Sequence, residues 1–184
     1  MQIITKGEYK QKRERLIQQI AQGALFIFPS DTIYRVGCDA TNSQAVKQLR
    51  ALKKTTMPFS VIAPSKQWIR QHCIVNEEGE EALDLLPDRY VLIMDLRNKN
   101  AISQHVTNGL DAVGVRIPRN WTQEIATLLN RPLVTTTANV AGGSPMTSLD
   151  NIPSALRKKI TFCLDGGEIP LRSINVIDLR KNQA

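Results

Sequence analysis

The chain of 184 residues has few of the residue types that build metal centres or disulfide frameworks. It contains only three cysteines, Cys38, Cys73 and Cys163, and two histidines. No two cysteines are spaced as Cys-x-x-Cys, so we expect reduced thiols rather than disulfides or a structural zinc site. His72 and His105 have no Cys or His at ligand spacing. The sequence therefore predicts no metal site formed by the protein alone.

Long apolar runs are also missing. No stretch approaches the roughly 20 apolar residues needed to cross a bilayer. Residues 1–7 lack the apolar segment and the small-residue cleavage site of a signal peptide. We therefore expect a cytoplasmic protein without a membrane partner. Length and a 42% hydrophobic content suit one domain over residues 1–184.

The common signatures of nucleotide loops and covalent catalysis are absent as well. The sequence contains no GxxxxGK[ST] loop, no GxGxxG fingerprint and no GxSxG elbow. It does carry 24 basic against 17 acidic residues, for a net charge of +7. This excess favours an anionic partner such as a nucleotide, a phosphate or RNA. A merely basic, solvated surface is about equally compatible with the charge.

Helix and strand patterns alternate along the chain, which predicts an α/β fold. Helices are expected at residues 8–22, from 41 or 42 to 52, at 65–73, from 76, at 121–129 and at 148–159, and strands at 24–28, 59–63, 90–96, 112–117, 133–136, 162–164 and 176–177. Ligands of open α/β sheets bind beyond strand ends. Three such loops carry polar residues, at 29–34, 116–119 and 135–143.

The first loop offers the hydroxyls of Ser30 and Thr32 beside Asp31. These groups could contact a ligand, or they could satisfy the backbone of their own turn. Arg116 lies in a predicted strand between β-branched residues and suits bidentate capture of a carboxylate or phosphate. A structural ion pair is an equal alternative for it.

The third loop combines three threonines, Asn139 and two glycines, a set of donors that can surround a phosphate or ribose. Lys53 and Lys54 end a predicted helix. Either they interact with the helix dipole or they hold a phosphate, and spacing alone favours the dipole.

Taken in order, these segments resemble the YrdC/TsaC family of L-threonylcarbamoyladenylate synthases. The family motifs PTDTxYGLGCDA, VGVRxP, TSANxSG and STVVDL correspond to PSDTIYRVGCDA at residues 29–40, VGVRIP at 113–118, TTANVAG at 136–142 and VIDL at 176–179. The resemblance extends from about residue 8 to about residue 180. It implies a YrdC-like twisted, open mixed sheet with flanking helices and a basic concave face, in the short form without a further C-terminal domain.

The resemblance also implies an activity: L-threonine, bicarbonate and ATP give threonylcarbamoyl-AMP and pyrophosphate, with Mg²⁺ on the ATP phosphates. The product is used to modify adenosine 37 of tRNAs. This makes tRNA or other RNA, and the proteins of the later modification steps, possible partners.

The same resemblance suggests roles for individual residues. Thr32, Tyr34 and Arg116 would bind threonine, with the arginine on its carboxylate, and Lys53 would meet the ATP phosphates. The other candidates for the ATP and phosphate region are Ser30, Arg35, Lys54, Thr135, Thr137 and Asn139. No residue is assigned as catalytic, because the chemistry would rest on positioning and charge stabilisation.

Four segments depart from the family pattern. Arg35 replaces the usual glycine after the tyrosine, and the KxR signature becomes Lys53-Lys54-Thr55. The PGP turn is Pro87-Asp88-Arg89, and Ile174-Asn175 replaces the final Ser-Thr pair. Two alternatives therefore accompany the synthase hypothesis: a non-catalytic nucleotide- or RNA-binding protein with a degenerate phosphate site, and a related adenylate-forming enzyme for another amino acid.

Overall fold

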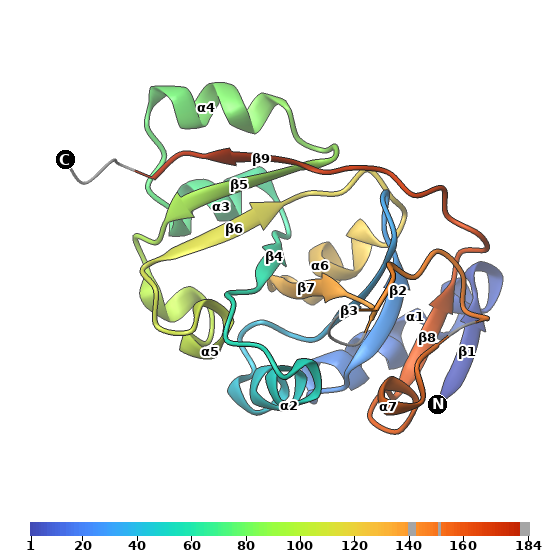
Figure 1. Ribbon diagram of the computed structural model, residues 1–184. Coiled ribbons are helices and arrows are strands. Elements are labelled where there is room, and N and C mark those ends of the chain that lie inside the picture. Colours follow the sequence, from blue (N-terminus) through green and yellow to red (C-terminus); the bar gives the residue numbers. More distant parts are fainter. Residues whose placement is uncertain (140–142, 151, 181–184) are drawn as a thin grey trace.

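The computed structural model describes residues 1–139, 143–150 and 152–180. Its strands are β1 (Gln2–Thr5), β2 (Phe26–Pro29), β3 (Tyr34–Gly37), β4 (Ser60–Ile62), β5 (Tyr90–Asp95), β6 (Ala112–Arg116), β7 (Leu133–Thr137), β8 (Phe162–Asp165) and β9 (Asn175–Asp178). They form a mixed sheet in the order β1-β8-β2-β3-β7-β4-β6-β5-β9. Figure 1 shows the open, twisted sheet, so the predicted α/β class is confirmed.

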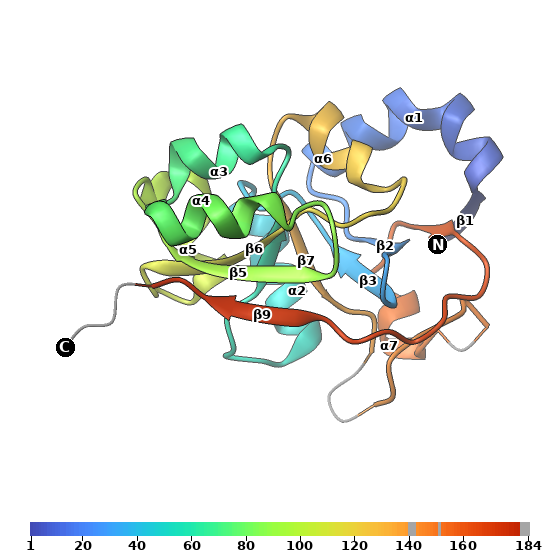
Figure 2. The same cartoon turned by 90° about the horizontal axis from the view of Figure 1, so that it is seen from above.

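The helices are α1 (Lys6–Ala21), α2 (Ser43–Lys53), α3 (Lys66–His72), α4 (Glu77–Asp84), α5 (Gln104–Thr107), α6 (Gln123–Leu129) and α7 (Ser154–Arg157), with a 3₁₀ turn at Lys99–Ala101. Figure 2 shows α1 and α6 beside each other, and α3 and α4 beside β5. Within the described residues, no helix has the length and hydropathy to span a membrane.

Side-chain caps explain where several helices begin. Asn42 accepts a hydrogen bond from the Ala45 amide at 3.0 Å, and Asn76 accepts one from the Gly79 amide at 2.8 Å. Ser65 caps α3 in the same way. Each cap satisfies an amide that has no partner inside its helix, a contribution of about 1 kcal/mol. The starts of α2, α3 and α4 therefore lie where the sequence predicts them.

Two strands and two helices differ from the expectation. Neither β1 nor α5 was expected, and Tyr34, expected at the end of a loop, begins β3. The segment 29–34 is thus the turn of a hairpin in which β2 and β3 pair antiparallel. The predicted helix 148–159 is wrong, because among the described residues of this range only Ser154–Arg157 is helical. Pro153 precedes it as its N-cap, where a ring without an N–H cannot continue a longer helix.

The core consists of two clusters on opposite faces of the sheet. Phe26 and Phe28 pack in the cluster that α1 and α6 cover, whereas Ile27 belongs to the other cluster. This alternation follows the period of two along a strand. Gly37 lets β3 approach β7 closely, because a Cβ at this position would lie 2.4 Å from the Val134 carbonyl oxygen.

The three cysteines are free and buried in the core. Burial raises the pKa of Cys73 and Cys163 to about 12, so these thiols stay protonated at neutral pH. Among the described residues, no group of three or more His, Cys, Asp or Glu side chains could hold a metal ion.

Candidate functional site

Four adjacent strands direct polar side chains to the same face of the sheet. Arg35 on β3 pairs with Thr137 on β7, two residues beyond Thr135. Thr135 in turn pairs with Ser60 on β4, and Ser60 pairs with Gly114 on β6. Arg116 belongs to the same set, because it lies two positions beyond Gly114 on β6. Because side chains two apart on a strand share a face, the register brings these residues together from distant parts of the chain.

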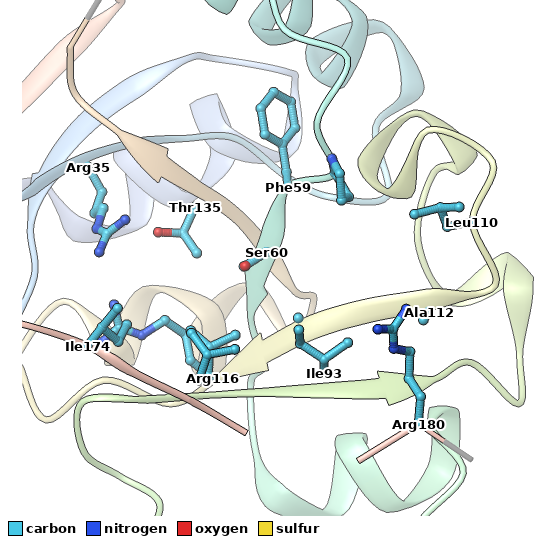
Figure 3. A pocket seen from close by; sticks show the side chains of 14 residues that line it. Arg35, Phe59, Ser60, Ile93, Leu110, Ala112, Arg116, Thr135, Ile174 and Arg180 are labelled. Carbon is cyan, nitrogen blue, oxygen red and sulfur yellow. The ribbon is translucent and has the colours of Figure 1, made fainter. Parts of the chain in front are cut away.

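They open onto a cavity of about 370 Å³. Its lining comprises Arg35, Pro58, Phe59, Ser60, Val91, Ile93, Leu110, Ala112, Gly114, Arg116, Thr135, Ile174, Val176 and Arg180. Three arginines and no acidic residue are present among these lining residues. In Figure 3, Arg35, Thr135 and Arg116 gather at one end, and Leu110, Ala112 and Arg180 lie at the other. The cavity thus has one end with two arginines and a hydroxyl group, and another with apolar side chains and Arg180.

Arg116 is held by a buried ion pair. Its Nη2 donates to Asp31 Oδ1, while Asp31 Oδ2 accepts a hydrogen bond from the Arg119 amide at 3.0 Å. The Arg116 side chain is only 1% exposed. Its Nε and Nη1 atoms have no hydrogen-bond partner among the described residues. One edge of the guanidinium is therefore fixed, and further donors remain for a ligand.

Arg35 and Thr135 have similar unsatisfied groups. Arg35 Nη2 donates to Thr32 Oγ1 at 3.2 Å, but its buried Nε has no partner in the described part of the chain. The same holds for the hydroxyl of Thr135, a residue that is 5% exposed. A buried polar atom without a partner costs about 1–3 kcal/mol. Several such atoms around one cavity indicate a binding site for a ligand with hydrogen-bond acceptors.

The electrostatics of this end favour an anion. Burial and the neighbouring charge of Arg116 lower the pKa of Arg35 to about 10, and Asp31 acts in the opposite direction. Burial also lowers the pKa of Arg116, while Asp31 raises it. Both guanidinium groups remain charged at neutral pH, so a bound anion would relieve their mutual repulsion.

Lys53 lies beside the cavity and is fully engaged by the loop after β7. Its Nζ donates to the carbonyl oxygens of Thr137 at 2.8 Å and Asn139 at 2.5 Å, and to Asn139 Oδ1 at 2.9 Å. Only 8% of Lys53 is exposed. Burial, together with the charge of Arg35, lowers its pKa. In this structure Lys53 therefore holds the loop.

The three residues of this cluster are linked further. Thr137 Oγ1 donates to Asn139 Oδ1 at 2.5 Å, and Asn139 Nδ2 donates to the Gly143 carbonyl at 2.7 Å. Asn139 also lines a separate cavity of about 270 Å³. Val140, Ala141 and Gly142, which belong to the predicted loop, lie outside the described residues.

The remaining predicted residues lie elsewhere. Ser30 Oγ donates to the Ile33 carbonyl at 2.7 Å and contacts Thr32 Oγ1 at 3.0 Å, so this turn satisfies its own backbone. The Tyr34 hydroxyl donates to the Gly167 carbonyl at 2.7 Å. Lys54 is the exposed C-cap of α2 in the left-handed conformation. None of these three groups lines the 370 Å³ cavity.

Sequence reasoning missed the lining contributed by β4 and β5. Ser60 and Val91 carry no motif, and only the strand pairing places them around the arginines. Gly114, a glycine inside a predicted strand, was a further signal in the sequence. A Cβ there would lie 2.7 Å from Ser60 Oγ and 3.0 Å from a Val91 methyl group, so glycine keeps the cavity open.

Comparisons with known proteins agree with this architecture. The family model Sua5/YciO/YrdC, described as telomere recombination, matches residues 18–184. A Methanocaldococcus jannaschii protein, provisionally named threonylcarbamoyl-AMP synthase, is 30% identical over 168 residues, which are 90% of this chain and 78% of that protein. The threonylcarbamoyl-AMP synthase of Pyrococcus abyssi is 29% identical over 87% of this chain and 48% of its own length.

Solved structures give the same picture. The complex of P. abyssi Sua5 with L-threonine has a TM-score of 0.84 and 27% identity, and covers 97% of this chain and 54% of the Sua5 chain. Escherichia coli YciO, at 16% identity and a TM-score of 0.84, shares the fold. The chain thus spans about half the length of the P. abyssi protein.

Proposed function

The chain belongs to the Sua5/YciO/YrdC family, and from this membership we propose that it is an L-threonylcarbamoyladenylate synthase. The two curated relatives compared above carry this activity in their names. They favour the synthase over a non-catalytic nucleotide- or RNA-binding protein. By the family resemblance the product serves tRNA modification, so tRNA and the proteins of later steps are proposed partners, and the cytoplasm is the proposed location.

The reaction requires two steps. The amine of L-threonine combines with bicarbonate to give a carbamate, with loss of water. A carbamate oxygen then forms a bond to the α-phosphorus of ATP, and the bond to the β,γ-diphosphate breaks, which releases pyrophosphate. Such a sequence needs precise placement of anions more than a nucleophilic side chain. A cationic cavity closed on one side by apolar strands meets this requirement.

The single observation that carries the proposal is the pair of free donors on the buried Arg116. Because Asp31 holds Nη2, the free Nε and Nη1 donors have fixed directions, and each can donate a hydrogen bond to an anion in the cavity. We propose that they bind the carboxylate of L-threonine. Thr32 contributes to the proposed site indirectly: its hydroxyl accepts a hydrogen bond from Arg35, which lines the cavity.

The proposed phosphate region comprises Arg35, Thr135 and the loop that Lys53 holds. Mg²⁺ enters the proposal only as a companion of the ATP phosphates, a common arrangement for this ion. The described residues present no cluster of acidic side chains that would bind it independently. No step above depends on a metal held by the protein.

The test is an assay of the purified chain with ATP, L-threonine and labelled bicarbonate. We expect labelled threonylcarbamoyl-AMP, and pyrophosphate in equal amount, only when all three substrates are present. Arg116→Lys should raise the KM for threonine by about tenfold or more, because a lysine ammonium group cannot contact Asp31 and also supply both remaining guanidinium donors. Absence of product from the well-folded chain, beside an active family synthase, would exclude the activity.

A further inference from the structure

The loop between α2 and β4, residues 54–59, forms part of the wall of the 370 Å³ cavity. Its last two residues, Pro58 and Phe59, are lining residues. Figure 3 shows Phe59 and Arg116 on opposite sides of Ser60. The loop therefore borders a part of the cavity that lies away from the carboxylate site proposed at Arg116.

Arg50, in the last turn of α2, binds this loop through its main chain. Its Nη1 atom donates to the carbonyl oxygens of Thr55 at 2.9 Å and Met57 at 3.1 Å. Its Nε and Nη2 atoms donate to the His105 carbonyl of α5 at 3.0 and 2.6 Å, and Nη2 also donates to the Val106 carbonyl at 3.2 Å. One planar side chain thus ties the loop to α5, and all three of its nitrogens already have carbonyl partners.

Two further contacts complete the arrangement. Asn108, the left-handed C-cap of α5, donates from Nδ2 to the Thr56 carbonyl at 3.0 Å. Side chains therefore hold the carbonyl groups of three successive residues, 55–57. The Arg50 guanidinium also lies over the Phe59 ring, with its Cζ atom 4.5 Å from the ring centroid, and this cation–π contact favours one orientation of the ring.

The loop has little else to fix its shape. Of residues 54–59, only Phe59 is buried, and Met57 is 70% exposed. Segments with few buried contacts open at a low cost in free energy. Without Arg50, the loop would keep the bond from the Phe59 amide to the Val106 carbonyl, at 2.8 Å, and the bond from Asn108.

We propose that Arg50 is a positioning residue for ATP binding. It fixes residues 54–59 and thereby sets the wall formed by Pro58 and Phe59. The identity of the ligand as ATP rests on the proposed function, whereas the positioning of the loop does not. A threonine bound at Arg116 is short and stays at that end of the cavity. ATP is several times longer and extends along the cavity to this wall, so loss of Arg50 affects ATP and spares threonine.

The experiment measures the ATP affinity of the whole chain by isothermal titration calorimetry, and KM and kcat in the synthase assay. Arg50→Met removes the donors and the charge but keeps an unbranched side chain. The matched control is Arg15→Met on α1, because Arg15 is exposed and makes no hydrogen bond or ion pair with the other described residues. Asn108→Gly removes the third contact to the loop and keeps the left-handed backbone, which glycine tolerates. Amide hydrogen exchange at Met57 and Phe59 reports on the loop itself.

We expect Arg50→Met to weaken ATP binding and raise the KM for ATP by about tenfold, with the KM for threonine and kcat unchanged within about twofold. Exchange at residues 57 and 59 should become about tenfold faster. Asn108→Gly should change the same quantities by about threefold, because one bond is lost, and Arg15→Met by less than about twofold. Arg50→Lys should fall between wild type and Arg50→Met, since an ammonium group keeps the charge without the planar donor set. A purely structural role would lower the amount of active protein, and hence the apparent kcat, without changing KM.

Three results would overturn the proposal: an ATP affinity in Arg50→Met equal to that of the wild-type chain, an equal rise in the KM for threonine, or unaltered exchange at residues 57 and 59. Circular dichroism confirms folding first, and Arg50→Lys and Asn108→Gly provide the comparison if Arg50→Met does not fold. Failure of the proposed function has a different result. Arg50-dependent ATP affinity without threonylcarbamoyl-AMP would retain the positioning role and remove the synthase, whereas synthase activity with unchanged ATP affinity in Arg50→Met would do the reverse.

Discussion

Replacement of Asp31 by asparagine tests whether the buried ion pair positions Arg116. Asparagine preserves the size of the side chain and can still accept a hydrogen bond from the Arg119 amide, but it removes the negative charge. The side chains of Arg116 and Asp31 are 1% and 6% exposed. Loss of one partner from a buried pair leaves an uncompensated charge, which costs about 3–5 kcal/mol. We expect Asp31→Asn to lower the free energy of unfolding by about 3 kcal/mol, near the lower limit, because the amide oxygen remains an acceptor.

The assay is urea unfolding followed by circular dichroism, with a matched pair as control. Asp178 and Arg180 form an exposed ion pair, with side chains 45% and 49% exposed, so Asp178→Asn should cost less than about 1 kcal/mol. Arg116→Met alone should also lower the free energy of unfolding by about 3 kcal/mol, because it leaves the buried Asp31 carboxylate without its ion-pair partner. The double variant should cost far less than the sum of both.

Two outcomes would contradict this reasoning. If Asp31→Asn is no more costly than Asp178→Asn, the buried pair does not stabilise the fold. If the effects of Asp31→Asn and Arg116→Met simply add, the two side chains do not act as a unit, since coupled residues deviate from additivity by about 0.5–3 kcal/mol.

Three further predictions follow from other contacts. Lys53→Met removes the donor that holds Thr137 and Asn139, and should cost about 2 kcal/mol in urea unfolding and speed amide exchange at residue 139; unchanged exchange would refute the loop-holding role. Gly114→Ala places a Cβ 2.7 Å from a neighbouring hydroxyl and should raise the KM for substrates, whereas Gly7→Ala, with open space around its Cβ, should leave it unchanged. Burial raises the pKa of Tyr34 to about 12, above its unfolded value near 10, so its contribution is complete below pH 10 and is lost between pH 10 and 12. Tyr34→Phe should therefore flatten the fall of the unfolding free energy across that range, measured by urea unfolding at each pH; an unaltered slope would contradict the assignment.

The predicted site residues were partly brought together by the fold. Arg35, Arg116 and Thr135 share one cavity, and Lys53, Thr137 and Asn139 share one hydrogen-bonded cluster. These residues could be identified as candidates from the sequence because they are polar residues next to predicted apolar strands. The sequence could not show whether the hydroxyls of Ser30 and Tyr34 contact a ligand or the protein backbone, because the same residue type fits both roles.

The local sequence determined the positions of most helices and strands. Caps such as Asn42 and Asn76, and apolar runs such as residues 24–28, act over a few residues and need no distant partner. The same local rules failed at residues 148–159, where Pro153 keeps the helix from beginning earlier, and at β3, which is stable as a strand because β2 and β7 pair with its two edges.

What only the tertiary structure decided is which side chains have partners. Asp31 and Arg116 are 85 positions apart, and Lys53 and Asn139 are 86 apart, so nothing in the local sequence links them. Strand register sets these pairings, and register depends on the packing of the whole sheet. The sequence by itself thus determined a basic α/β chain of a recognisable family. The folded sheet decided that Lys53 is bound to a loop, while Arg35 and Arg116 retain free donors for a ligand.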